Sequence, residues 1–129
     1  MSELPEPGGN PRPTEDALQW QLDRMGSTAW EGWSLKFQQM AYGFADETGI
    51  ADSRQTLRWL AARGGLGNGQ PPRGKLVWYT GGDCGRASVM SSLGDGKVVG
   101  AGVDAAVGVM DYRDRDGYVG WSEPVFPYA

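Results

Sequence analysis

The spacing of hydrophobic residues changes once along this chain, from a helical to an extended period. In the first half, apolar residues recur every three or four positions, which is typical of amphipathic helices. Helices are expected over 14–25, 32–44 and 52–63, with Thr14 and Asp52 as caps of the first and third. The middle helix has the clearest apolar stripe, formed by Trp33, Phe37, Met40, Ala41 and Phe44.

Beyond residue 74 the sequence is rich in β-branched and aromatic residues between turn signals, which predicts strands. The expected antiparallel strands are 74–80, 88–93, 97–102 and 106–112, with 118–121 as a fifth candidate. Gly94-Asp95-Gly96 predicts a tight turn between the second and third. Helices followed by strands indicate an α+β domain, with the N-terminal helices on one face of an antiparallel sheet of four or five strands.

The length of 129 residues fits one domain with a single core. Residues 1–13 hold four prolines and little to bury, so we expect a flexible N-terminal segment there and one folded domain over 14–129. No stretch has the pattern of a signal peptide or a membrane span, so a cytoplasmic location and no membrane partner are expected.

Charge and metal-binding residue types exclude several functions. Twelve basic against 16 acidic residues give a net charge of −4 without a basic run, so no nucleic-acid partner is expected. The chain has no histidine and one cysteine, Cys84, which excludes an internal disulfide and a zinc site of the usual ligands. The glycine-rich stretch 64–70 lacks the Lys-Ser/Thr pair of a phosphate-binding loop. No cofactor is expected.

The segment 112–123 matches part of an EF-hand calcium loop. Asp114, Asp116, Gly117 and Glu123 fall on ligand or turn positions of that loop, but Tyr112 stands at its first position and the flanks look extended. We therefore expect no metal, and interpret Asp116-Gly117 as a hairpin turn.

Ser34 stands at the entrance of the middle helix, in the segment GSTAWEGWSLKF. Helix N-termini carry unpaired amides that stabilise an anion, so a nucleophile could sit there. A small residue that fits a tight helix entrance and forms a local hydrogen bond is the alternative interpretation. Trp30 and Trp33 stand beside Ser34. Because Trp33 belongs to the apolar stripe, Trp30 is the better candidate for a pocket wall.

Several short segments, WEGWSLKF, PPRGKLVWY, ASVMSSLGDGKVV and GYVGWSEPVFP, occur in an order that resembles the NlpC-type branch of the papain-like cysteine peptidases and amidases, related to CHAP domains. The resemblance covers roughly residues 14 to 126 and implies a papain-like fold. That family has a nucleophilic cysteine where this chain has Ser34. Its histidine aligns with Ser88, and its third polar residue falls near Gly100 to Gly102.

All three catalytic positions therefore depart from the family pattern. A serine hydroxyl is a far weaker acid than a thiol, and no histidine can take its proton. The resemblance thus implies a catalytically degenerate domain without cysteine-peptidase chemistry. Other candidate catalytic groups are Cys84 with its neighbours Asp83 and Arg86, and the carboxylates Glu31, Asp95 and Asp104.

Three functional hypotheses remain open from the sequence. In the first, the former active-site cleft binds or transforms a small, largely apolar molecule through Trp30, Trp33, Ser34, Ser88 and Arg86. A non-covalent cyclisation or isomerisation would be possible there. In the second, the domain is a non-enzymatic module that docks a protein partner. In the third, it is a residual hydrolase or amidase that uses Cys84.

Overall fold

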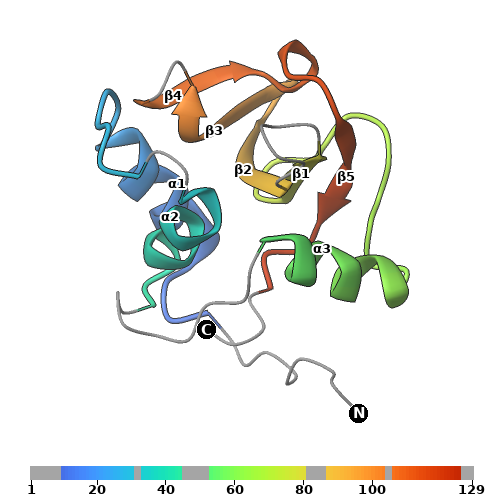
Figure 1. Cartoon of the computed structure of the whole chain (residues 1–129). Helices are drawn as coiled ribbons and strands as arrows, with labels where there is room; N and C mark the ends of the chain where they lie inside the picture. The colour runs from blue at the N-terminus through green and yellow to red at the C-terminus, as the bar shows by residue number, and fades with distance from the viewer. Residues whose placement is uncertain (1–9, 31–32, 45–52, 81–86, 104–105, 126–129) are drawn as a thin grey trace.

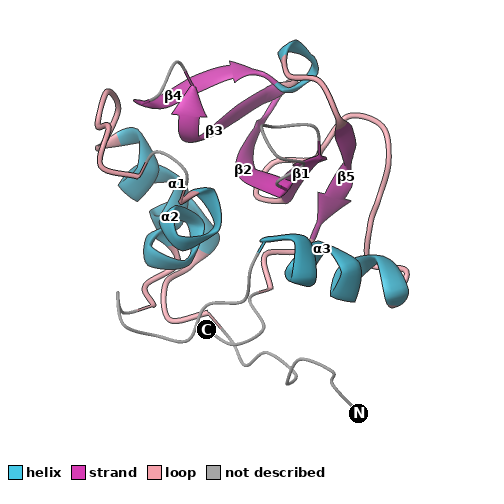
Figure 2. Ribbon diagram, in the orientation of Figure 1, coloured by secondary structure: helices cyan, strands magenta, loops and turns pink. Residues whose placement is uncertain are grey.

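The computed structural model describes residues 10–30, 33–44, 53–80, 87–103 and 106–125. Three helices precede a sheet of five antiparallel strands, as expected (Figures 1 and 2). The helices are α1 (Thr14–Leu22), α2 (Ser34–Ala41) and α3 (Ser53–Ala62), and the strands are β1 (Leu76–Thr80), β2 (Ala87–Gly94), β3 (Lys97–Val103), β4 (Ala106–Asp111) and β5 (Tyr118–Ser122). The protein is thus an α+β domain.

The strand order in the sheet is β4-β3-β2-β1-β5. The first four strands form a meander, and the β2–β3 turn is the expected one, with positive φ at Asp95 (53°) and Gly96 (81°). β5 pairs with β1 instead of β4, after a short 3₁₀ turn, η2 (Tyr112–Asp114). The prediction of a hairpin turn at Asp116-Gly117 is therefore wrong, because the chain crosses there to the opposite edge of the sheet.

Each face of the sheet has its own cluster of buried residues. Side chains alternate along β1, so Leu76 and Trp78 pack toward the helices while Val77 and Tyr79 pack on the opposite face. The cluster on the helix side also holds Leu35 of α2, Leu60 of α3 and Val89 of β2. The smaller opposite cluster adds Met90 and Val98, with Val103, Met110, Tyr112 and Tyr118 packed around it. In the view of Figure 1, α1 and α2 lie to the left of β2, and α3 lies below β5.

The helices begin and end within a few residues of their expected bounds. α1 ends at Leu22, three residues early, and Met25 is 50% exposed instead of closing the apolar stripe. The prediction that Thr14 caps this helix is also wrong, because Pro13 stands at the N-cap and Thr14 is the first residue of the helix. The expected cap Asp52 lies outside the described residues. α2 ends at Ala41, just before Gly43 takes a φ of 95°.

The chain makes specific contacts from Asn10 onward, four residues before the expected domain boundary. Arg12 donates from Nη1 to the carbonyls of Met40 (3.2 Å) and Ala41 (2.8 Å) at the end of α2. A cation there offsets the negative end of the helix dipole. Asn10 donates to the carbonyl of Pro124 (2.6 Å). Among the described residues, no helix is long and apolar enough to cross a bilayer.

Candidate functional site

Ser34 is the first residue of α2 and lies against the backbone of β2. Its Oγ accepts a hydrogen bond from the amide of Val89 at 3.2 Å. The β2–β3 pairing runs from Gly94–Lys97 only as far as Ser91–Val99, so this amide lies beyond it. Ser34 thus supplies the acceptor that a neighbouring strand would otherwise offer. The sequence left a local hydrogen bond open as the alternative to a nucleophile, and the observed bond is instead a long-range one that joins α2 to β2.

Ser88 lies one residue from Ser34's partner, but its side chain belongs to the other face of the sheet. Ser88 is paired directly with Tyr79 across β1 and β2, whereas Val89 packs in the cluster on the helix side. Because successive side chains of a strand alternate between faces, the Ser34 and Ser88 hydroxyls lie on opposite sides of β2. Ser34 therefore contacts the backbone of the residue next to Ser88, but the two side chains do not line one cleft, contrary to the expectation from the sequence.

Arg115, which sequence reasoning did not single out, reaches Ser88. It follows η2, and its Nη1 donates to Ser88 Oγ at 3.4 Å while Nη2 donates to the carbonyl of Gly102 at 2.6 Å. Its guanidinium lies over the Tyr79 ring, 5.6 Å from the centroid. We call Tyr79, Ser88, Gly102 and Arg115 the Ser88–Arg115 site. Gly102 belongs to the segment aligned with the third polar residue of the family pattern.

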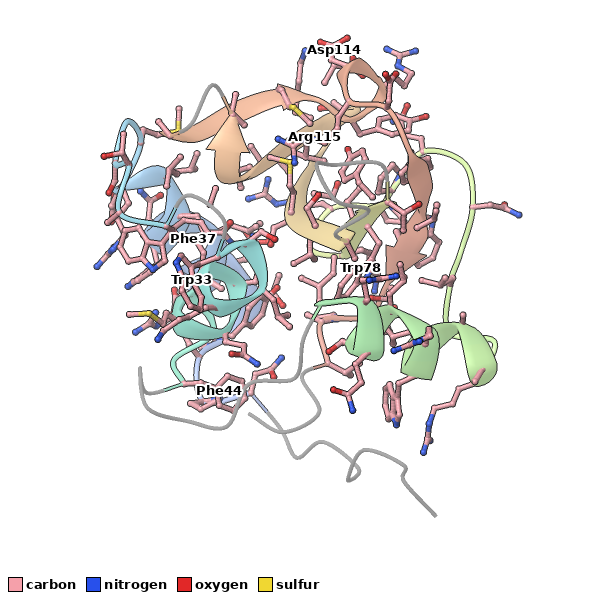
Figure 3. All side chains as sticks on the ribbon, in the orientation of Figure 1. Trp33, Phe37, Phe44, Trp78, Asp114 and Arg115 are labelled. Atoms are coloured by element: carbon pink, nitrogen blue, oxygen red, sulfur yellow. The ribbon has the colours of Figure 1, made fainter. Side chains whose placement is uncertain are left out.

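The charge of Arg115 is not paired with a carboxylate within the described part of the chain. Its sequence neighbours Asp114 and Asp116 are both exposed. In Figure 3, Asp114 lies at the outer edge of the loop and Arg115 lies nearer the middle of the molecule. Residues 113–116 alternate basic and acidic side chains, and the fold turns Arg115 toward Ser88 of β2.

Aromatic side chains surround this site on the face of the sheet away from the helices. Tyr79 is buried, and its hydroxyl donates to the carbonyl of Tyr112 at 2.8 Å. The Tyr118 ring lies 5.9 Å from Tyr79 and 5.1 Å from Tyr112, centroid to centroid. Burial raises the pKa of Tyr79, and the charge of Arg115 offsets part of that effect. Among the described residues, the site thus combines aromatic rings with the charge of Arg115 and a serine hydroxyl, and the Asp111 carboxylate lies near enough to raise the pKa of Tyr79 further.

The two tryptophans near Ser34 have the reverse of their expected environments. Trp33 is 58% exposed, so its assignment to the buried stripe of α2 is wrong. Trp30 packs instead against Phe37 and Trp20, with ring centroids at 5.1 and 5.8 Å. The physical reason is that α2 begins at Ser34, which leaves Trp33 before the helix and off its buried face.

The other predicted candidates do not join the site. Asp95 is exposed in the β2–β3 turn, at the end of β2 away from Ser88. Glu31, Asp83, Cys84, Arg86 and Asp104 lie outside the described residues. Of the four residues of the EF-hand match, Asp114 lies in η2 and Glu123 pairs with Lys75 at 2.6 Å. Within the described segments, no three acidic or cysteine side chains gather as metal ligands.

A solved structure with a similar fold agrees with the arrangement of helices and strands described above. The chain is similar to the crystal structure of the P60 domain of an antigen from M. avium subspecies paratuberculosis, with a TM-score of 0.59 and 20% sequence identity over 87% of this chain and 94% of that one. The chain has an NlpC/P60-like fold. No family model and no curated protein matches the sequence. The papain-like α+β architecture implied by the sequence resemblance is thereby confirmed.

Proposed function

We propose that this NlpC/P60-like domain binds a small, largely apolar molecule at the Ser88–Arg115 site, without cysteine-peptidase chemistry. The observation that supports this most is Arg115, which is held over Tyr79 beside Ser88 without a carboxylate partner in the described residues. Partly buried Val103, Met110, Tyr112 and Tyr118 add an apolar surface around it. Apolar walls with a few placed polar groups are typical of small-molecule sites.

The chemistry of Ser34 favours binding over covalent catalysis. Its Oγ already accepts the Val89 amide, and the chain contains no histidine to remove its proton. Activation of a serine needs an adjacent base within hydrogen-bond reach. The proposal includes a reaction only of the kind that positioning accelerates, such as a cyclisation of a molecule held in a reactive shape.

The proposal is tested by titrating the ¹⁵N-labelled protein with a library of small aromatic molecules and following backbone amide shifts. We expect saturable shifts at Ser88, Gly102 and Arg115. Replacing Ser88→Phe should abolish them, because it removes the hydroxyl and places a bulky ring beside Arg115, whereas Thr28→Phe, in an exposed loop, should preserve them. If Ser88→Phe lowers the melting temperature, Ser88→Val provides a smaller change. Shifts that are absent, or unaffected by both Ser88 variants, would refute the proposal.

A protein-interaction module is the second candidate, and the exposure of Trp33 favours it. An indole that is 58% exposed is a common anchor of protein interfaces. The charge of Lys36 lies 5.7 Å from that ring. If this candidate is correct, Trp33→Ala should abolish capture of a partner and leave the amide shifts of the Ser88–Arg115 site unchanged.

The predicted cytoplasmic location stays a prediction.

A further inference from the structure

Arg115 differs from two other arginines of this protein in how its charge is satisfied. Arg73 donates from Nε and Nη2 to both oxygens of Glu15, at 3.1 and 2.7 Å. Arg113, two residues before Arg115, donates in the same way to Asp111, at 2.9 and 2.8 Å. Both form the bidentate pair that a planar guanidinium favours with a carboxylate. Arg115 has no such partner among the described residues.

The position of Arg115 is fixed by neutral groups. The Gly102 carbonyl takes one of its five N–H donors and Ser88 Oγ takes another, while the Tyr79 ring supports the guanidinium. Three donors are left without a partner in the described chain. Because neutral acceptors hold the side chain in place, little entropy is lost when a ligand binds to it.

Ser88 adds a further donor at the same place. Its Oγ accepts from Arg115, so the hydroxyl hydrogen is free to point at a second acceptor. A guanidinium and a hydroxyl side by side offer several donors and a positive charge, which suits an anion. Nearby, Tyr112 and Tyr118 form an apolar surface. An anionic group attached to a small apolar or aromatic body combines both features.

We propose that Arg115 and Ser88 bind the carboxylate of a small aromatic or aliphatic carboxylic acid, whose apolar part lies along Tyr112 and Tyr118. This inference rests on the proposed function, because it assigns the ligand class of the same site. A planar carboxylate matches the planar donor fork of arginine. Its single negative charge is balanced by the one charge of Arg115, whereas a doubly charged phosphonate would leave one charge unpaired.

The test compares benzoate with benzamide, which has the same shape without the charge, by amide shifts of Ser88 and Gly102. Benzoate should bind the wild type saturably and at least about tenfold more tightly than benzamide, as expected for a charge-assisted pair. Arg115→Gln should remove at least about tenfold of the benzoate affinity. Arg113→Gln, which removes the same charge from the same loop, should change it less than about twofold.

Each other outcome has a defined meaning. Equal benzoate affinity in the wild type and Arg115→Gln overturns the inference, as does tighter binding of phenylphosphonate than of benzoate. If benzamide binds at the site and benzoate does not, the inference of a carboxylate ligand is overturned, while the proposed function still stands. If neither molecule nor any neutral aromatic shifts Ser88, the proposed function fails with it. Should Arg115→Gln melt early, Arg115→Lys replaces it, and unchanged benzoate affinity in that variant also overturns the inference.

Discussion

Single residues explain how the start of α2 is joined to the sheet. The amide of Val89 belongs to a fully buried residue, and Ser34 Oγ is its acceptor. We predict that Ser34→Ala destabilises the fold by about 1–2 kcal/mol, because a buried donor is left unpaired. Urea unfolding followed by tryptophan fluorescence measures this. Ser27→Ala, in a loop, should stay within about 0.5 kcal/mol of the wild type, and equal stability of both variants would contradict the structural role.

A second prediction for a single residue concerns how Tyr79 affects stability at alkaline pH. Burial raises the pKa of Tyr79 above its ordinary value of 10.0, so the folded state keeps this tyrosine neutral where the unfolded state ionises. The contribution of Tyr79 to the free energy of unfolding is therefore fully present below pH 10.0, and it is lost as the pH rises above that value. Tyr79→Phe cannot ionise at this position.

The comparison is made by urea unfolding of both proteins from about pH 8 to about pH 11. At the lower pH, Tyr79→Phe should be less stable by about 1 kcal/mol, since the bond to the Tyr112 carbonyl is lost. The difference should shrink above pH 10.0. Because the remaining tyrosines titrate in both proteins, a gap that stays constant with pH would show that burial of Tyr79 does not perturb its ionisation.

Residue environments were the part of the site least accessible from the sequence. Spacing placed Trp33 on the buried stripe because it assumed that the helix begins before this residue, and a shift of two positions in the helix start reversed its exposure. Arg115 was overlooked because a charged loop has no periodicity. Its contacts with Ser88 and Gly102 join residues 27 and 13 positions away, and these depend on the complete sheet.

At the scale of elements, α2 shows what a hydrophobic pattern can and cannot predict. The helix was correctly expected, but its buried face includes Gln38. This side chain exchanges two hydrogen bonds with Gln21 of α1, at 3.1 and 2.9 Å, and accepts a third from Ser91 of β2 at 2.5 Å. All three residues are fully buried. Apolar periodicity cannot detect a polar cluster whose members satisfy one another.

The glycine-rich loop 64–70 is explained by its contact with β5. Gly67 donates to the carbonyl of Trp121 at 2.7 Å and accepts from its amide at 3.1 Å, while the Trp121 indole donates to the Asn68 carbonyl at 3.0 Å. A Cβ on Gly67 would stand 2.3 Å from the Trp121 ring. Only glycine allows this approach.

We predict that Gly67→Ala lowers the free energy of unfolding by about 1–3 kcal/mol, because the indole must move away from the loop. Thermal unfolding measures the loss, and a shift of indole fluorescence reports the displaced ring. Asn68→Ala is the matched control, because the bond from Trp121 uses only the backbone of Asn68. If the two variants were equally stable, the loop would not hold β5 in the way described.

At the scale of the whole molecule, the sequence predicted the fold class and the local hairpins but not the closure of the sheet. The Gly94-Asp95-Gly96 turn joins adjacent strands, so its residues alone specify the pairing. Pairing of β5 with β1 joins segments about 40 residues apart, and no local signal specifies it. That crossover carries Arg115 past β2, and it therefore creates the Ser88–Arg115 site.

We propose that this NlpC/P60-like domain binds its ligand at Ser88 and Arg115, while Ser34 joins the start of α2 to β2. The most direct test is a crystal structure of the protein soaked with the small molecule that gives the largest saturable shift of the Ser88 amide. We predict density on the Tyr79 face of β2, in contact with Ser88 and Arg115, with Ser34 Oγ still accepting the Val89 amide. Density bonded covalently to Ser34 Oγ, or density only at the exposed Trp33, would contradict the account.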